Sequence, residues 1–476
     1  MMKADIGLIG LATMGQNLAL NIERNQYTIA VYNRTTERLD EFINGKGFEK
    51  NIIGCYDVEN LCNTLKKPRI ILLMIKAGKP VDDSISMLLP FLEPGDIIID
   101  GGNSFFSDTI RRLKKLENKG IHYLGAGISG GEEGALKGPS IMPGGSLEAW
   151  KHVEEIFTKI TAKINGDPCC SYIGSDGAGH YVKMVHNGIE YSDMQLISEI
   201  YYILKKFLNL TAYELAKIFA EWDKGDLNSY LIKITSKILL EEDPVTKNPL
   251  VDMILDSAKQ KGTGKWASQE ALEMGVPVPS ITEAVYARNI SSKREERLEA
   301  SKLLTGPTPQ FSGEKSILVE ATRKALIAAK ICSYAQGFSL LKAASDEYKW
   351  ELNLSNIAQI WRNGCIIRAR FLKQVKVAFQ QDKDLSNLLL DSYFSDVIKT
   401  SQEDWRFVVN LAVENGIPIP ALSSALSYYD SYRNPSLPAN LIQAQRDYFG
   451  AHGFERVDKE QGLIYHYEKW APLDED

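Results

Sequence analysis

The sequence has few cysteines, no membrane-length apolar run and no recognisable signal peptide. Its six cysteines form no CxxC pair and no cysteine–histidine spacing typical of metal ligands. No segment approaches the roughly 20 apolar residues that a membrane-spanning helix needs. The amino terminus leads into an apolar run that carries Asp5, unlike a cleavable signal. We therefore expect a cytoplasmic chain with reduced, mostly buried thiols, no membrane partner and no metal.

An excess of positive charge is also missing. The 55 Lys and Arg residues face 61 Asp and Glu residues, for a formal net charge of −6. A mildly acidic protein attracts polyanions poorly, so we predict no nucleic-acid partner, and a phosphate-bearing ligand would need a local basic cluster. The 476 residues, 44% of them hydrophobic, are enough for about two to four globular domains.

The first half of the chain alternates between two patterns. Short apolar runs end in turn residues: Ile6–Ile9, Thr28–Tyr32, Ile70–Ile75, Ile97–Asp100 and Ile121–Leu124. Amphipathic stretches of helical length lie between them: Asn17–Arg24, Glu37–Ile43, Val81–Leu89 and Ser107–Asn118. Strands that alternate with helices predict an α/β domain with a parallel, doubly wound, Rossmann-like sheet, which we place at residues 1–178.

A glycine turn follows the first strand. The sequence Gly10-Leu11-Ala12-Thr13-Met14-Gly15 leads into a helix that we expect to begin near Gln16. A strand, a glycine turn and a helix in this order are the setting of a dinucleotide site, where the helix N-terminus binds pyrophosphate. Ala12 replaces the usual middle glycine, so this turn alone fits an ordinary turn equally well.

The tip of the second strand indicates which dinucleotide binds. NAD enzymes carry an acidic residue about 20 positions beyond the turn, on the ribose. Here Arg34, between Asn33 and Thr35, follows Gly15 by 19 residues, and no carboxylate occupies the tip. A guanidinium and a hydroxyl favour a 2′-phosphate, which predicts NADP; the alternative is a solvated arginine in a loop. We expect nearby Glu37 in the first turn of the next helix, where its charge suits the helix dipole.

Three further polar segments follow predicted strands of the sheet. Lys76 and Asn103 follow two of its strands, and ligands of open parallel sheets bind beyond such strand ends. The segment Ser129-Gly130-Gly131-Glu132-Glu133-Gly134 is rich in glycine. Its backbone N–H groups could form an anion-binding nest, or the segment could be a mobile surface loop.

The second half is helical and repeats itself. Residues 208–211 (LNLT) recur as residues 352–355 (LNLS), and residues 273–279 (EMGVPVP) recur as residues 414–420 (ENGIPIP). The order and near-equal spacing predict a large all-α domain, residues 179–435, with an internal duplication of a unit of roughly 140 residues. We expect residues 436–476, which end in an acidic triplet, to be a tail that docks on this subunit or on a partner.

One predicted helix carries a polar stripe among apolar and small residues. The stripe has the spacing i, i+3, i+4, i+7 and i+8: Lys183, His186, Asn187, Glu190 and Tyr191. Burial of such groups is unfavourable unless they serve each other or a ligand. A structural network is the alternative, but the second copy of the repeat lacks Lys-x-x-His-Asn, which favours a function.

These residues together resemble the decarboxylating 6-phosphogluconate dehydrogenases over nearly the whole chain. The resemblance rests on the glycine turn, residues 33–35, 129–134 and 183–191, and on two further blocks: Asp256-x-x-x-Gln260-Lys261-Gly262-Thr263-Gly264-x-Trp266 and residues 443–452 (QAQRDYFGAH). It implies a cytoplasmic, homodimeric oxidoreductase of the pentose phosphate pathway and of gluconate utilization. The implied reaction converts 6-phospho-D-gluconate to D-ribulose 5-phosphate and carbon dioxide and reduces NADP to NADPH.

The resemblance also implies residue roles. Lys183 is the general base and Glu190 the general acid. The cofactor is held by Gly10, Leu11, Ala12, Thr13, Met14, Gly15, Asn33, Arg34, Thr35, Ile75, Lys76, Ala77 and Asn103. The sugar acid is held by Asn103, Ser129, Gly130, Gly131, His186, Asn187 and Tyr191. Its phosphate is held by Lys261, Arg288, Arg446 and His452, of which Arg446 and His452 reach across the dimer interface.

The sequence departs from the family pattern at two places and leaves two alternatives. Ser192 stands where glycine is usual, and Gly453-Phe454 replaces a usual Thr-Tyr. We expect the second departure to affect how the tail docks on the partner subunit. One alternative is a simpler β-hydroxyacid dehydrogenase, which does not need the duplication, the Lys261 block or the basic tail. The other is a cofactor-binding sensor or scaffold without turnover, against which the retention of both Lys183 and Glu190 argues.

Overall fold

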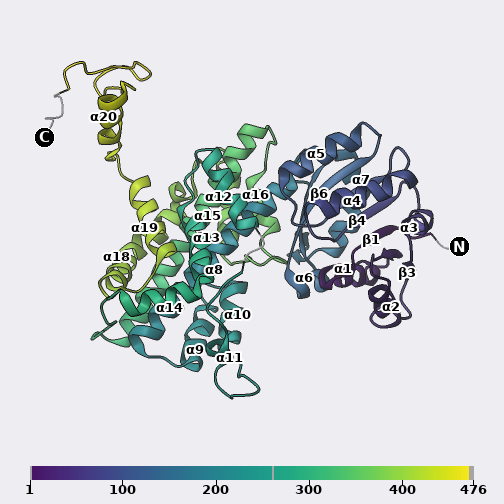
Figure 1. The fold of residues 1–476 in the computed structure, drawn as a ribbon, viewed down its shortest axis with the longest axis horizontal. Helices are drawn as coiled ribbons and strands as arrows, with labels where there is room; N and C mark the ends of the chain where they lie inside the picture. Colours follow the sequence, from purple (N-terminus) through teal and green to yellow (C-terminus); the bar gives the residue numbers. More distant parts are fainter. Residues whose placement is uncertain (1–2, 260–261, 471–476) are drawn as a thin grey trace. The chain divides into compact units, whose positions relative to one another are not determined.

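The structure is a computed structural model and describes residues 3–259 and 262–470 (Figure 1). The chain divides into two compact units, Met1–Leu426 and Ser427–Asp476. The first unit holds a sheet with its covering helices and a large set of further helices. The domain boundaries predicted at residues 178 and 435 stay predictions.

A seven-stranded sheet organises the amino-terminal part. Its spatial order is β3-β2-β1-β4-β5-β6-β7. The strands are β1 (Ile6–Ile9), β2 (Ile29–Tyr32), β3 (Ile52–Cys55), β4 (Ile70–Leu73), β5 (Ile97–Asp100), β6 (His122–Ser129) and β7 (Ser140–Gly145). The first six pair in parallel, with Leu8 opposite both Val31 and Leu72. Continuous apolar runs form these strands because helices cover both faces of the sheet.

Two of these strands, β3 and β7, are not among the predicted ones. β3 contains Gly54 and β7 contains Pro143 and two glycines, which weaken the strand pattern. The sheet is parallel as predicted except at one edge, where β7 runs antiparallel to β6. The edge position of β7 also explains why a proline is tolerated there.

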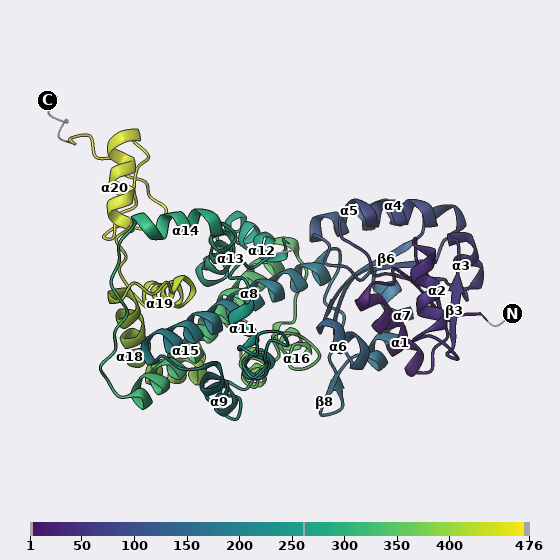
Figure 2. The same cartoon turned by 60° about the horizontal axis from the view of Figure 1, so that its bottom comes forward.

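Helices on the two faces of the sheet bury two separate apolar clusters. α1 (Thr13–Arg24) and α7 (Leu147–Ile160) cover one face. α3 (Val58–Thr64), α4 (Lys79–Leu88) and α5 (Phe106–Glu117) cover the other, and Figure 2 shows α4 and α5 opposite α1 and α7. α1 begins at Thr13, three residues before the predicted start at Gln16. The remaining short elements are α2 (Thr36–Asn44), η1 (Leu89–Phe91), α6 (Gly131–Lys137), β8 (Lys163–Ile164) and β9 (Asp167–Pro168).

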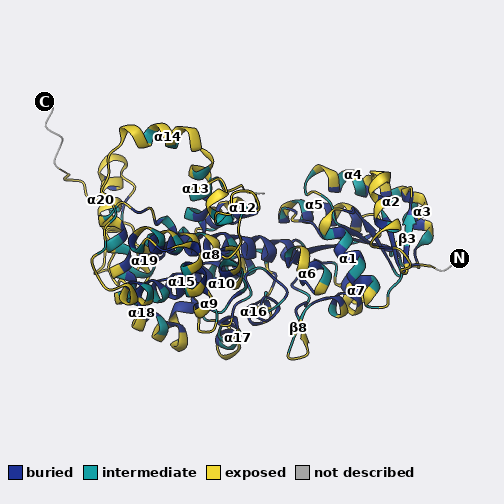
Figure 3. Cartoon of the chain, turned by 90° about the horizontal axis from the view of Figure 1, so that it is seen from below, coloured by how far each residue is buried: buried dark blue, intermediate teal, exposed yellow. Residues whose placement is uncertain are grey.

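Two long helices form the centre of the helical part. α8 (Ala178–Leu208) packs against β6, β7 and α15 (Lys315–Tyr348), and both helices are largely buried (Figure 3). α12 (Thr263–Glu273) and α13 (Pro279–Ser292) also pack on α8, and α18 (Ser392–Glu414) packs on α15. The other helices are α9 (Ala212–Trp222), α10 (Tyr230–Ile238), α11 (Leu250–Met253), α14 (Arg294–Leu303), α16 (Leu354–Ile360), α17 (Leu372–Gln381), η2 (Leu388–Leu390), α19 (Pro420–Tyr432) and α20 (Ala439–Gly450).

The repeated motifs occupy matching places at helix ends. Thr211 caps α9 just after α8, and Asn353 caps α16 just after α15. Gly275 and Gly416 both have a φ of 64° and follow α12 and α18, a conformation that glycine adopts without strain. In both copies the next helix begins at the second proline of the motif.

Ser192, one of the departures from the family pattern, lies on the face of α8 that meets α15. Its Oγ lies 2.7 Å from Oγ of Ser333, and both residues are buried. One residue further on, Asp193 pairs with buried Lys330 of α15. The serine therefore adds a helix–helix hydrogen bond and leaves the polar stripe of α8 unchanged.

Asp447 organises the second unit. This buried carboxylate on α20 accepts hydrogen bonds from the backbone N–H of Gly453 at 2.9 Å, from that of Tyr467 at 3.0 Å and from Nε1 of Trp470 at 2.9 Å, and it lies 3.1 Å from Nδ1 of His466. These donors lower the pKa of Asp447 to about 2. Gly453, another departure, has a φ of 72°, and a Cβ there would lie 2.4 Å from Ile464, so the segment is shaped around a glycine.

The six cysteines are buried free thiols, as expected: Cys55, Cys62, Cys169, Cys170, Cys332 and Cys365. In the described part of the chain, no helix combines the length and the apolar character needed to cross a membrane.

Candidate active site

Four neighbouring strands deliver the predicted cofactor residues to one edge of the sheet. Gly10 follows β1, Asn33 follows β2, the Ile75–Ala77 segment follows β4, and Asn103 follows β5. Because β2, β1, β4 and β5 are adjacent and parallel, their carboxyl ends open on the same crevice. The structure therefore brings these four segments together.

The glycine turn has no room for side chains at its two glycines. Gly10 has a φ of 104°, and a Cβ there would lie 2.5 Å from the carbonyl oxygen of Met74. A Cβ at Gly15 would lie 1.9 Å from the carbonyl oxygen of Gly10. The backbone N–H of Leu11 donates to Oδ1 of Asn33 at 2.9 Å, which fixes the turn against the tip of β2. Exposed Ala12 precedes α1, whose first residues are Thr13 and Met14.

The basic groups at this edge are free to meet a ligand. Arg34 is exposed, and among the described residues no carboxylate pairs with it. Thr35, Lys76 and Asn103 are exposed as well. Nδ2 of Asn33 donates to the carbonyl of Thr35 at 2.9 Å and holds the loop that carries Arg34. An exposed guanidinium beside a tight glycine turn fits a dinucleotide with an additional phosphate.

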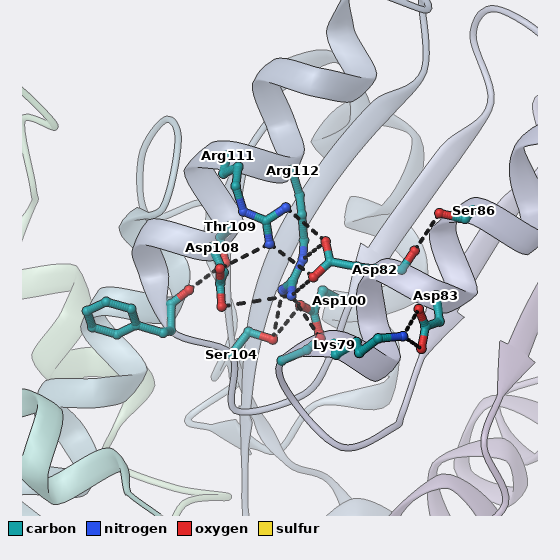
Figure 4. Close-up of polar contacts among 12 residues, drawn as sticks. Lys79, Asp82, Asp83, Ser86, Asp100, Ser104, Asp108, Thr109, Arg111 and Arg112 are labelled. Atoms are coloured by element: carbon teal, nitrogen blue, oxygen red, sulfur yellow. Dashed lines mark hydrogen bonds and ion pairs between the residues drawn. The ribbon is translucent and has the colours of Figure 1, made fainter.

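A buried ion network, missed by the sequence analysis, shapes the loops after β4 and β5 (Figure 4). Asp100 ends β5 and accepts hydrogen bonds from Oγ of Ser104 at 2.6 Å and from the N–H of Gly102 at 3.1 Å. Arg112 of α5 reaches Asp100 at 3.4 Å and donates to the carbonyl of Gly78 and to Asp82, both at 3.0 Å. The network holds the Asn103 loop and the residue that follows the Ile75–Ala77 segment. In the sequence, the only signal for it is the charged residue Asp100 at the end of an otherwise apolar strand.

Glycines in β6 let the polar stripe of α8 approach the sheet closely. A Cβ at Gly127 would lie 2.3 Å from Cβ of Lys183, and one at Gly125 would lie 2.7 Å from Nδ1 of His180. Lys183 is 5% exposed and His186 is fully buried. The small residues of β6 therefore place the start of α8 directly on the strand that leads to the Ser129 segment.

His186 lies at the centre of the stripe. Its Nδ1 lies 3.5 Å from Nζ of Lys183, 3.1 Å from Oδ1 of Asn187 and 3.7 Å from Oε2 of Glu190. Its Nε2 lies 3.2 Å from Oγ of Ser129, and its ring packs edge-on against Trp361. The histidine thus links the amine, the carboxyl and the glycine-rich segment, while 21% of the Glu190 side chain stays exposed.

The Ser129 segment is part of the packed structure. Ser129 and Gly130 are buried and Gly131 is half-buried, so a mobile surface loop does not describe them. Gly130 has a φ of 141°, and a Cβ there would lie 2.5 Å from the carbonyl oxygen of Gly364. The N–H of Ile366, a residue that the sequence analysis did not single out, donates to Oγ of Ser129 at 3.4 Å.

α12 and α13 complete the surroundings of the stripe. Nδ2 of Asn187 donates to Oγ1 of Thr263 at 3.0 Å, and the Arg288 guanidinium carbon stacks 3.6 Å above the Tyr191 ring. A Cβ at Gly264 would lie 2.5 Å from that ring. Thr263 belongs to the Lys261 block, but no role is predicted for it, since its contact depends on how α12 packs. Lys261 lies outside the described residues.

Burial shifts the pKa values of Lys183, Glu190 and His186 in the stripe. It lowers the pKa of Lys183, against the opposing effect of the Glu190 charge. It raises the pKa of Glu190, against the positive charges of Lys183 and Arg288. It also holds the pKa of His186 well below its usual range, so this imidazole stays neutral near pH 7. A lysine driven towards the neutral amine and a carboxyl driven towards the acid form are suited to proton transfer.

Arg446 and His452 belong to the second unit. Arg446 is exposed on α20, and its Nη1 donates to Oε1 of Gln443 at 3.1 Å. Exposed His452 contacts Phe449 edge-on and directly precedes Gly453, whose N–H is held by Asp447. Both basic side chains therefore extend from a segment fixed by one carboxylate.

Known proteins resemble the chain from end to end. The family models described as the NAD binding domain and the C-terminal domain of 6-phosphogluconate dehydrogenase match residues 5–174 and 179–470. The chain belongs to the 6-phosphogluconate dehydrogenase family. It is 58% identical to the NADP(+)-dependent, decarboxylating 6-phosphogluconate dehydrogenase of Bacillus subtilis, over 98% of this chain and 99% of that one. It is 55% identical to the decarboxylating enzyme of Escherichia coli, with the same coverage.

A solved structure of the family has the same fold. The 6-phosphogluconate dehydrogenase of Plasmodium falciparum, studied in its apo form and with NADP+ and 6-phosphogluconate, superposes with a TM-score of 0.94 at 48% identity. The alignment covers 98% of this chain and all of that one. The predicted membership of the 6-phosphogluconate dehydrogenase family, and the predicted Rossmann-like domain followed by a large helical domain, are confirmed.

Proposed function

We propose that this chain catalyses the oxidative decarboxylation of 6-phospho-D-gluconate to D-ribulose 5-phosphate and carbon dioxide, with reduction of NADP to NADPH. One observation carries the proposal. Lys183 and Glu190 lie on one stripe of α8, on either side of neutral His186 and beside the Ser129 segment. The relatives over the full chain length are enzymes of this name, which supports the assignment.

The first step is oxidation at carbon 3 of the substrate. Bound NADP supplies the hydride acceptor. Lys183, as the neutral amine that burial favours, removes the proton from the carbon 3 hydroxyl while hydride leaves the same carbon. The product is a 3-keto acid, in which the carboxylate is β to the new carbonyl.

Decarboxylation and protonation complete the reaction. The carbon 1 carboxylate leaves as carbon dioxide, and the electron pair of the broken bond moves towards the carbon 3 oxygen. Protonated Lys183 donates a hydrogen bond or its proton to this developing enolate oxygen and so stabilises charge where it forms. Glu190, whose pKa burial raises, then delivers a proton to the carbon that lost carbon dioxide.

We assign roles to the surrounding residues from the resemblance to the family. Asn103, Ser129, Gly130, Gly131, His186, Asn187 and Tyr191 would hold the sugar acid. Lys261, Arg288, Arg446 and His452 would hold its phosphate, the last two from the partner subunit of a homodimer. The turn Gly10–Gly15, Asn33, Arg34, Thr35, the Ile75–Ala77 segment and Asn103 would hold NADP. The enzyme would act in the cytoplasm, in the pentose phosphate pathway.

An assay of the purified chain tests the reaction. We expect absorbance at the NADPH wavelength to rise with 6-phosphogluconate and NADP, with one carbon dioxide trapped for each NADPH formed. With NAD the rate should be much lower. NADPH formation without carbon dioxide would contradict the decarboxylation, and no reduction of either cofactor would contradict the whole proposal.

Replacement of Arg34 by Asp should weaken the binding of NADP far more than that of NAD. The change removes a cation from the 2′-phosphate and adds a repelling carboxylate, so kcat/KM for NADP should fall by about 10²-fold or more. kcat/KM for NAD should change little, because NAD lacks that phosphate. Arg38→Asp makes the same charge change four residues further along, at an exposed position of α2, and serves as the control. An equal loss with both cofactors would contradict the 2′-phosphate assignment.

A further inference from the structure

Five of the eleven residues that line a cavity of the first unit are cations. Its volume is about 400 Å³, and it lies between the connection from α9 to α10 and the segment that joins α16 to α17. Five basic side chains and one carboxylate line it: Lys233, Arg362, Arg368, Arg370, Lys373 and Asp223. A chain with a net charge of −6 has thus concentrated positive charge around one hollow.

The cations that line this cavity are not paired with the carboxylate that lines it. Among the described residues, none of the five cations forms an ion pair with a carboxylate. Asp223 is engaged locally, since its Oδ1 accepts from Nδ2 of Asn228 at 3.0 Å and from the N–H of Ser229 at 3.3 Å. Like charges held close together repel, and an anion between them relieves that repulsion.

The cavity wall is a built structure. Ser229 pairs with Ala369 in an antiparallel bridge, and the N–H of Arg370 donates to the carbonyl of Asn228 at 2.9 Å. Two contacts hold the Arg368 guanidinium in place. Its Nη1 donates to the carbonyl of Cys365 at 2.6 Å, and its central carbon stacks 3.7 Å above the Tyr230 ring. A guanidinium held in place loses little freedom on binding an anion.

We propose that this cavity is a second anion site, which binds a small molecule carrying phosphate groups. Its volume falls within the range of small-ligand pockets, and planar guanidinium groups suit phosphate oxygens. None of the residues proposed to bind NADP or 6-phosphogluconate lines it, so it is separate from the active site. The shared chemistry is a compact multivalent anion, and we commit to phosphate rather than carboxylate.

Calorimetric titration with inorganic pyrophosphate tests the site. The enzyme is first saturated with NADPH and 6-phosphogluconate, which occupy the other phosphate sites without turnover; this step rests on the proposed function. We compare K233Q/K373Q with K237Q/K376Q, which removes one lysine from each of the same two helices outside the cavity. The wild type should bind one pyrophosphate per chain, and the cavity variant should bind about tenfold or more weakly. The control variant should match the wild type.

Each other outcome counts against the site. No pyrophosphate binding to the saturated wild type, or equal affinities of the two double variants, would overturn the proposal. Citrate binding as tight as pyrophosphate binding at equal ionic strength would overturn the phosphate assignment. A failure of the proposed function is distinguished beforehand, because 6-phosphogluconate would then release no heat on titration into the enzyme.

Discussion

Replacement of Lys183 by Met is expected to lower kcat for NADPH formation by about 10³- to 10⁴-fold, while 6-phosphogluconate and NADPH still bind. The amine has two roles in the proposed reaction, as the base during oxidation and as the donor to the enolate oxygen. Both are lost with methionine. The side chain is buried with no carboxylate in hydrogen-bonding contact among the described residues, so an apolar chain of similar volume leaves no unpaired charge behind.

The measurement is steady-state kinetics together with calorimetric binding of 6-phosphogluconate. Lys206→Met provides a matched control, since Lys206 is exposed near the other end of the same helix. The control should keep wild-type kcat. Retention of more than about a tenth of wild-type kcat in Lys183→Met would remove Lys183 from the base role. Loss of substrate binding with kcat unchanged would make it a binding residue instead.

Local patterns predicted the elements that depend on local sequence. β1 and β5 have the predicted bounds, because each is a short run dominated by isoleucine and leucine, which is typical of a strand buried on both faces. The polar stripe of α8 was predicted because helix geometry alone sets the spacing of its members. β3 and β7 were missed where glycine and proline interrupt the pattern, and the start of α1 was misplaced because no side chain caps it.

The contacts that complete the site depend on tertiary packing. Thr263 and Ile366 reach Asn187 and Ser129 from segments about 76 and 237 residues away in sequence, at separations that no local pattern encodes. The ion network around Arg112 likewise joins α4, α5 and the end of β5. The roles of Arg446 and His452 came from the family resemblance alone, and they remain predictions.

Replacement of Glu190 by Gln should lower kcat by about 10²- to 10³-fold and change its pH dependence. Burial raises the pKa of Glu190, and the acid form is the one that donates a proton. Wild-type kcat should therefore fall as pH rises through the pKa of Glu190 in the complex. Glutamine has no proton to lose, so the variant should lack this alkaline limb. The charged and titratable groups that face Glu190 are Lys183, His186, Asp193 and Arg288 on α8 and α13, and Tyr334 on α15.

A pH–kcat profile from pH 5 to about 10 separates this role from a structural one. Glu273→Gln is the control, because Glu273 is an exposed carboxyl on α12, which packs on α8. The control should keep both the wild-type rate and the alkaline limb. An unchanged limb in Glu190→Gln would mean that another group donates the proton to the carbon that lost carbon dioxide. A variant that still forms NADPH and carbon dioxide at the wild-type rate would show that Lys183 works without a carboxyl partner on α8.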